Sequence, residues 1–239
     1  MKHQHKTEEI VSTELPMRME GEKLKEFEKM LSQSGDGVES DVVSMRHHDF
    51  SVYGLNTMCA VIAKLKGEDL NVLEIGCYRG EGSVIFHGWF KNVDCVDPYG
   101  KGNEISEIDD TVETNPSGTD WADEEMRYHR TLETAKYLME NNVIPFHDGI
   151  TLHHQTSDDF FAVNKKKYDL IYVDGDHRYS QQIRDYTNSL KCLKENGILA
   201  GHDWSWQSTQ KVIEELDFKK MPMMHFVDDS FCMIPENLL

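Results

Sequence analysis

Two short polar stretches, each directly after an apolar run, hold the residues of this chain that could do acid–base or metal chemistry. The first is Asp174 to His177, which follows YDLIYV, and the second is His202-Asp203, which follows ILAG. Carboxylate oxygens are ligands that suit a divalent cation, and a carboxylate or an imidazole can also take a proton from a reacting group. The pattern therefore predicts a site that binds a cation, moves a proton, or does both.

A glycine-rich turn follows another apolar run, in the stretch NVLEIGCYRGEGS from Asn71 to Ser83. The apolar residues before the turn are typical of a buried strand, and Gly76 and Gly80 would let the chain turn tightly beside a ligand. The helix that begins after the turn would present unpaired backbone N–H groups and the positive end of its dipole. This pattern favours a nucleotide-type ligand that carries a carboxylate or a phosphate.

Asp97 ends the next apolar run, about 20 residues beyond the turn, as recognition of a ribose by an acidic side chain requires. The turn itself, from Gly76 to Gly80, has the spacing G-x-x-x-G, whereas dehydrogenase turns have G-x-G-x-x-G. The alternative is an ordinary strand-to-helix turn followed by a solvated Asp97.

The elements that position these stretches alternate along the chain. Apolar runs predict strands at residues 72–75, 93–96, 143–147, 168–173 and 198–201, with two tail strands near 225–227 and 231–234 joined by a turn at 228–230. Helical periodicity predicts helices at residues 55–66, 84–90, 121–141, 179–193 and 209–216. This order predicts an α/β fold, a doubly wound seven-stranded Rossmann-like sheet with helices on both faces.

Ligands of an open parallel sheet bind outside the carboxyl ends of its strands, where the strand order reverses. Asp97, Asp174 and Asp203 each fall at such an end, so we expect them to meet at one edge of the sheet. Three carboxylates at one edge repel one another unless a cation or a positively charged ligand compensates.

The glycine turn, with Glu74 before it and Asp97 after it, resembles motifs I and II of class I S-adenosylmethionine (SAM)-dependent methyltransferases. The segment YDLIYVDGDHRYSQQIRDYTNSLKCLKENGILAGHDW resembles the pattern of small-molecule O-methyltransferases related to macrocin O-methyltransferase. Together the two resemblances cover about Val72 to Asp203. They imply the methyltransferase type of Rossmann-like fold, SAM as the cofactor, and O-methylation of a small-molecule hydroxyl on a sugar or another polyhydroxylated metabolite.

The resemblance also implies roles for individual residues. Asp174 and Asp203 would bind Mg²⁺ or another divalent cation, and Asp176 would be the general base on the acceptor hydroxyl. His177 is a second candidate base, and His202 joins the metal group because it stands where metal-dependent members tend to carry another acidic residue. The predicted contacts with SAM are Glu74, Gly76, Cys77, Tyr78, Gly80, Ser83, Asp97, Tyr99, Asp148, Gly149 and Asp174.

Structural roles remain open for several of these residues. Asp176 could be a turn or capping residue before Arg178, and the Asp148-Gly149 pair could simply form a turn after the predicted third strand. Glu74 orients either the glycine turn or the amino group of the methionine moiety. His177 could be a polar neighbour of the core, and Tyr99 could pack on adenine or on Pro98. Trp204 and Trp206 could line an acceptor pocket or belong to the core. Asp185 is predicted to be a charge on a helix surface.

Two further functions fit the same residues. The group Asp174, His177, His202 and Asp203 could hold Fe²⁺ or Mn²⁺ in an oxygenase or hydrolase, since histidines with a carboxylate and open positions suit iron. The chain could also be a SAM-binding protein without catalysis.

Composition narrows the partners and the cellular compartment. With 25 Lys and Arg against 43 Asp and Glu, the net charge of −18 would repel nucleic acid and anionic membranes. The single lysine run, at 165–167, is predicted to be a solvated loop. Five cysteines without C-x-x-C spacing predict reduced core residues. No apolar run reaches the ~18 residues of a membrane span, and the start of the sequence has no hydrophobic signal core, so we expect a cytoplasmic protein.

The predicted domain organisation is an N-terminal extension with one helix at residues 1–50 and a methyltransferase domain at residues 51–239. The helix of the extension would either cover the site or pack on a partner subunit of a homo-oligomer. An acidic insertion at about residues 100–127 is either a lid or a surface excursion.

Overall fold

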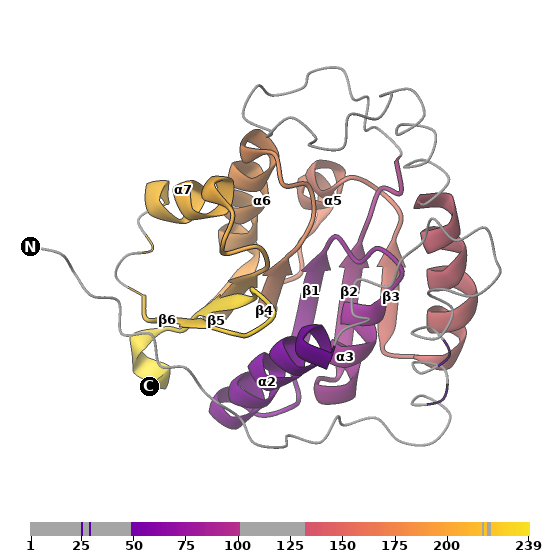
Figure 1. The fold of residues 1–239 in the computed structure, drawn as a ribbon, viewed down its shortest axis with the longest axis horizontal. Coiled ribbons are helices and arrows are strands. Elements are labelled where there is room, and N and C mark those ends of the chain that lie inside the picture. Colours follow the sequence, from indigo (N-terminus) through magenta and orange to yellow (C-terminus); the bar gives the residue numbers. More distant parts are fainter. Residues whose placement is uncertain (1–24, 26–28, 30–48, 101–131, 217, 219–220) are drawn as a thin grey trace, which may run out of the picture.

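A computed structural model gives the structure of the protein for residues 25, 29, 49–100, 132–216, 218 and 221–239. Strands and helices alternate along this part of the chain, and residues 132–138 form a helix that runs into η1 (Figure 1). In the region of the predicted N-terminal helix only residues 25 and 29 are described, both as helix, and residues 101–127 of the acidic insertion lie outside the described residues. The elements in chain order are α2 (Asp49–Lys66), β1 (Asn71–Ile75), α3 (Glu81–Trp89), β2 (Asn92–Val96), η1 (Met139–Val143), η2 (Ile144–Phe146), β3 (Ile150–His153), α5 (Ser157–Val163), β4 (Tyr168–Val173), α6 (Tyr179–Cys192), β5 (Leu193–Gly201), α7 (Gln207–Glu215), β6 (Met223–His225), β7 (Phe231–Met233) and η4 (Glu236–Leu238).

The strands form a 7-stranded sheet in the order β3-β2-β1-β4-β5-β7-β6. Strands β1 to β5 pair in parallel, and β7 is antiparallel to both β5 and β6. The strand order reverses between β1 and β4, which is where ligands of such sheets bind. The predicted doubly wound α/β fold with seven strands is confirmed.

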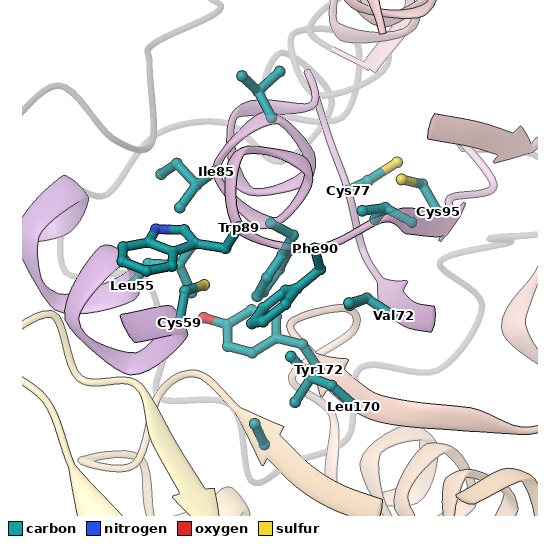
Figure 2. Close-up of a cluster of buried hydrophobic side chains, with 14 of the residues drawn as sticks. Leu55, Cys59, Val72, Cys77, Ile85, Trp89, Phe90, Cys95, Leu170 and Tyr172 are labelled. Atoms are coloured by element: carbon teal, nitrogen blue, oxygen red, sulfur yellow. The ribbon is translucent and has the colours of Figure 1, made fainter. Parts of the chain in front are cut away.

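Alternating side chains of the central strands supply two apolar cores, one on each face of the sheet. On one face, Val72 of β1 and Leu170 and Tyr172 of β4 pack under α2 and α3 (Figure 2). On the other face, Leu73 of β1 and Ile171 of β4 pack under α5, α6 and α7. Because both faces are covered, the central strands are mostly apolar, as parallel strands in this fold class are.

All five cysteines are buried and none of them forms a disulfide, in agreement with the prediction. Among the helices of the described ranges, none has the length and apolar character that a membrane crossing requires.

The third strand was predicted in the wrong place. Residues 139–146 form η1 and η2, with Pro145 in the first turn of η2, and the strand that pairs with β2 is β3. The apolar residues at 143–144 continue the preceding helix, so their hydrophobicity reflects packing of a helix end. Asp148 and Gly149 consequently lie at the amino end of β3, where the Gly149 carbonyl accepts a hydrogen bond from the Val93 N–H at 2.9 Å. This edge of the sheet is opposite to the carboxyl ends of the strands, so Asp148 and Gly149 lie away from the edge where SAM is expected.

The helix after β4 is shorter than predicted. It ends at Cys192, and β5 begins at once at Leu193 with an irregular register, so that Tyr168 faces Leu193 while Leu170 faces Ile198. Asn196 adopts φ 60° within this irregular part of the strand.

The pKa values of two buried aspartates are shifted in opposite directions. Burial alone would raise the pKa of Asp94, but the His153 imidazole at 3.5 Å and hydrogen bonds from Lys166 and Tyr168 outweigh it and lower the pKa to about 2. Lys166, from the run expected to be a solvated loop, therefore has a definite partner. Asp185 is 1% exposed, so its predicted place on a helix surface is wrong.

Burial raises the pKa of Asp185 to about 6, even though Ser157 and Gln181 donate hydrogen bonds to it. Repulsion from Asp158 and Asp176 acts in the same direction as burial. An acid whose pKa is higher in the folded state disfavours folding once it ionises, so this cost is absent below about pH 4 and complete above the folded pKa.

We therefore expect Asp185→Asn to stabilise the protein at pH 8, by up to about 3 kcal/mol, and to have little effect at pH 4. Urea unfolding at both pH values measures the change. Asp94→Asn is the matched control, because it removes a buried carboxylate with a lowered pKa and should destabilise at pH 8. Equal effects of the two substitutions at pH 8 would contradict the assignment of opposite environments.

Candidate functional site

Backbone hydrogen bonds continue past the carboxyl ends of the parallel strands and hold the following residues in one row. Asp97 donates its N–H to the His153 carbonyl at 3.3 Å, and Gly76 donates to Val96 at 2.8 Å. On the other side of the strand-order reversal, Asp174 donates to Ile75 at 2.8 Å and His202 donates to Val173 at 3.1 Å. The residues after β2, β1, β4 and β5 therefore meet at one edge of the sheet, as the sequence predicted.

The glycine turn between β1 and α3 requires glycine at two positions. Gly76 has φ 86° and Gly80 has φ 88°, both in the left-handed region. A Cβ atom on Gly76 would lie 2.1 Å from the Asp174 carbonyl oxygen, and one on Gly80 would lie 2.4 Å from the Met139 sulfur. The turn thus packs directly against the residue that follows β4.

Glu74 and Ser83 lie beneath this turn. Both are buried, and the Ser83 hydroxyl donates a hydrogen bond to the Glu74 carboxylate while Cys95 donates to Ser83 at 3.1 Å. A Cβ atom on Gly82 would lie 2.3 Å from Glu74 Oε1, so glycine at that position makes room for the carboxylate. Of the two roles expected for Glu74, this geometry supports orientation of the turn, and the Ser83 side chain has the same structural role.

Asp97 binds two backbone N–H groups at the end of β2. Its Oδ2 accepts from Tyr78 N–H at 2.8 Å and its Oδ1 accepts from Tyr99 N–H at 2.9 Å. The Tyr99 hydroxyl donates to the Tyr78 carbonyl at 2.6 Å and lies 3.5 Å from the Cys77 sulfur. Burial raises the pKa of Asp97, and the backbone donors oppose that shift. Asp97 therefore ties the glycine turn to the second strand and can still accept from a ligand hydroxyl, since each oxygen has two lone pairs.

A small pocket lies where the residues after β4 and β5 meet. His177 Nδ1 is 3.1 Å from Asp203 Oδ2, and Asp174 and Asp176 also line the pocket. Asp203 has φ 57°, a left-handed conformation that aspartate tolerates better than most residues do. Gln182 and Tyr186 of α6 line the same pocket. Neither residue is predicted to be part of the site. Tyr186 follows the apolar spacing of the predicted helix at 179–193, which indicates only a core residue, and no sequence signal distinguishes Gln182.

His202 lies close to two carboxylates of the pocket, those of Asp203 and Asp174. Its Nδ1 lies 3.0 Å from Asp203 Oδ1 and 3.8 Å from Asp174 Oδ1, and its Nε2–H donates to the Asp228 carbonyl at 2.6 Å. The imidazole therefore connects the pocket to the turn between β6 and β7. The sequence gave no sign of this contact, because it joins residues on elements that are distant along the chain.

Asp176 faces Arg178 in this structure. Its carboxylate accepts hydrogen bonds from the Arg178 backbone N–H at 2.8 Å and from the Arg178 guanidinium. These contacts match the turn role that the sequence left open and engage the carboxylate that was expected to act as the base.

The two tryptophans after β5 have different surroundings. Trp204 packs against Phe231 and His225, with ring centroids at 5.3 and 4.7 Å, so it belongs to the core. Trp206 is 48% exposed and its ring centroid lies 5.0 Å from that of His177. The rim of the pocket thus carries one accessible aromatic side chain.

The donor set of the pocket fits a divalent cation. Asp174, His177 and Asp203 each offer one ligand atom, and these atoms lie within 4.8 Å of one another. Two carboxylate oxygens and one imidazole nitrogen suit Mg²⁺ or Mn²⁺. The sequence predicted His202 in this group, and the structure brings His177 into it, since the loop after β4 folds back toward Asp203.

A family model described as a methyltransferase domain matches residues 73–204, more than half of the 239-residue chain. No curated protein matches the sequence.

Several solved structures are similar to this chain at low sequence identity. An O-methyltransferase from Bacillus cereus in complex with SAH is 11% identical, with a TM-score of 0.48 over 91% of this chain and 92% of that one. A putative caffeoyl-CoA O-methyltransferase from Staphylococcus aureus is 17% identical, with a TM-score of 0.49 over 75% and 80%. An rRNA methylase from Streptococcus thermophilus is 10% identical, with a TM-score of 0.49 over 74% and 91%. At these values the similarities carry no argument about what this chain binds.

The glycine turn offers a test of the close contact between β1 and β4. Gly67 and Gly76 both have a left-handed φ, but a Cβ atom on Gly67 would meet nothing within 4 Å. We expect Gly67→Ala to lower the free energy of unfolding by about 1 kcal/mol, the cost of the backbone conformation alone. Gly76→Ala should lower it by more than about 3 kcal/mol, because the turn must also move away from Asp174. Equal losses in urea unfolding would show that the turn and the loop after β4 are not in contact.

Proposed function

This chain belongs to the methyltransferase-domain family whose model matches residues 73–204, and we propose that it transfers the methyl group of SAM to a hydroxyl oxygen of a small molecule such as a sugar or another polyhydroxylated metabolite. One observation carries the proposal. The glycine turn abuts the loop that begins at Asp174, so a cofactor on the turn would lie beside a pocket that contains a carboxylate–imidazole pair. A net charge of −18 supports a small-molecule acceptor over a nucleic acid.

The donor half of the site is built from the turn and the end of β2. The first turn of α3 presents backbone N–H groups and a positive dipole end, which suit the carboxylate of SAM. Asp97, with lone pairs that Tyr78 and Tyr99 leave available, would accept hydrogen bonds from the ribose hydroxyls. The sulfonium would lie near the acidic pocket, where a positive charge is favoured.

The acceptor half needs a base. Methyl transfer requires the acceptor oxygen in line with the methyl–sulfur bond at roughly 3 Å, and a hydroxyl is a poor nucleophile until its proton leaves. His177 Nδ1 lies 3.1 Å from Asp203 Oδ2, so the carboxylate would hold the ring with its proton on Nδ1 and leave Nε2 with a lone pair for the hydroxyl proton. His177 is therefore a better candidate for the general base than Asp176, which Arg178 engages.

We also propose an alternative role for the same side chains, in which they bind a divalent cation. Asp174, His177 and Asp203 would hold it, and when bound it would act as a Lewis acid that lowers the pKa of the acceptor hydroxyl. His177 would then be a ligand, so its roles as ligand and as base exclude each other.

The donor assignment predicts the behaviour of Asp97. We expect Asp97→Ala to weaken SAM binding by at least about tenfold, because hydrogen bonds to a charged group are lost. Asp97→Asn should weaken it less, since the amide oxygen still accepts. Isothermal titration gives both affinities, and a melting curve without ligand shows whether the turn survives. Unchanged affinity in Asp97→Ala would contradict the assignment, and tight iron without any SAM binding by the wild type would favour an oxygenase or hydrolase.

The two roles of His177 can be separated by turnover and metal dependence. If His177 is the base, His177→Gln should lower the formation of S-adenosylhomocysteine by about 10²- to 10⁴-fold while SAM affinity is kept, and a chelator should leave the wild type active. If a cation is required, the chelator should abolish wild-type turnover and Mg²⁺ should restore it. Full activity of His177→Gln would exclude both roles, and SAM binding by the wild type without turnover would indicate a non-catalytic protein.

A further inference from the structure

We propose that Trp206 determines acceptor specificity, and that the acceptor is a hydroxylated ring whose flat face lies against the Trp206 indole. The inference rests on the proposed function, because it concerns the molecule that receives the methyl group. Trp206 touches His177, the residue placed at the reacting hydroxyl, and yet 48% of it stays exposed. A large apolar side chain left open beside a polar pocket marks a surface that a ligand can cover.

The position of Trp206 is fixed by the same turn that holds the reactive pair. Its N–H donates to the Asp203 carbonyl at 3.0 Å, and its carbonyl accepts from the Gln210 N–H at 3.1 Å in the first turn of α7. Asp203 in turn lies 3.1 Å from His177, and the rings of His177 and Trp206 are tilted by 45° with centroids 5.0 Å apart. Asp203, His177 and Trp206 therefore form a closed set of contacts, and the indole is preorganised relative to the imidazole.

The position of the second ring nitrogen of His177 limits which acceptors could lie on the indole and still react. Nδ1 faces Asp203, and Nε2 has no hydrogen-bond partner among the described residues. A ring that covered the exposed part of the indole would lie next to the imidazole, whose centroid is 5.0 Å from that of Trp206, and would carry its hydroxyls on its edge. An open-chain polyol offers no continuous apolar face and must lose more conformational freedom to bind. The geometry thus favours rings, whether aromatic or aliphatic, over open chains.

The test compares matched probes. Myo-inositol and sorbitol carry the same number of carbons and hydroxyls, but only myo-inositol is a ring, and catechol provides an aromatic ring with adjacent hydroxyls. Formation of S-adenosylhomocysteine is measured with each probe for the wild type, Trp206→Ala, Trp206→Phe and Tyr137→Ala. Tyr137 is 62% exposed and is the control for removal of an exposed aromatic side chain outside the site. The two ring probes show whether the face prefers an aromatic or an aliphatic ring.

We expect the wild type to prefer at least one ring probe over sorbitol. Trp206→Ala should raise the KM for that ring by roughly tenfold and remove the preference, whereas Trp206→Phe should keep both within about twofold, because stacking on an aromatic face is the interaction lost. The kcat, the SAM affinity and the properties of Tyr137→Ala should not change.

Three results would overturn the inference: equal use of sorbitol and both rings by the wild type, an unchanged KM in Trp206→Ala, or turnover of sorbitol but of neither ring. Failure of the proposed function is a separate result, since the wild type would then either fail to bind SAM or bind it without turnover of any of the three probes.

Discussion

The site depends on one constraint, which is that buried backbone N–H groups at the ends of parallel strands need partners. In this chain the partners are carbonyls of the neighbouring strands, so that the hydrogen-bond ladder continues beyond the last strand residue. Gly76 binds Val96, Asp174 binds Ile75, and His202 binds Val173. Each bond fixes the direction in which the chain leaves the sheet. The loops after β1, β4 and β5 therefore have little freedom, and their side chains meet at one edge of the sheet.

Several carboxylates lie at this edge of the sheet, and the negative charge of each is balanced by a different kind of partner. Asp97 receives backbone N–H groups, Asp176 receives a guanidinium, and Asp203 lies between two imidazoles. These differences assign different chemistry to residues of one type. A carboxylate held by backbone donors is oriented to accept from a ribose hydroxyl, whereas a carboxylate against an imidazole orients a group that can take a proton.

Much of the fold could be predicted from the sequence, because its strongest patterns are those of buried parallel strands and amphipathic helices. The strands at β1, β2 and β4 and the hairpin turn at Asp228 to Ser230 follow from apolar runs and turn residues alone. The third strand could not be placed, since its sequence ITLH is less apolar than the helix end at 143–144 that was taken for it. Only the pairing with β2 distinguishes the two, and pairing is a tertiary property.

In the site, too, some features follow from the local sequence and others depend on residues that are distant along the chain. Residues at strand ends were found because their position follows from the strand itself. The partners of their side chains were not, as the contact of Asp176 with Arg178 and the burial of Asp185 show. A charge next to a turn and a charge on a helix look alike in sequence whether they are solvated, paired or buried, and their environment is set by elements that arrive from elsewhere in the chain.

The left-handed conformation of Asp203 is held both by its own turn and by a residue that is distant along the chain. A non-glycine residue with φ 57° costs about 1 kcal/mol, and such conformations persist where the surroundings determine them. Here Trp204 N–H binds the Asp229 carbonyl and Trp206 N–H binds the Asp203 carbonyl, so the turn is held from both sides. The result is a carboxylate aimed at His177 and an indole beside the same ring. The backbone of one turn thus sets both the orientation of the proposed base and the surface that an acceptor would meet.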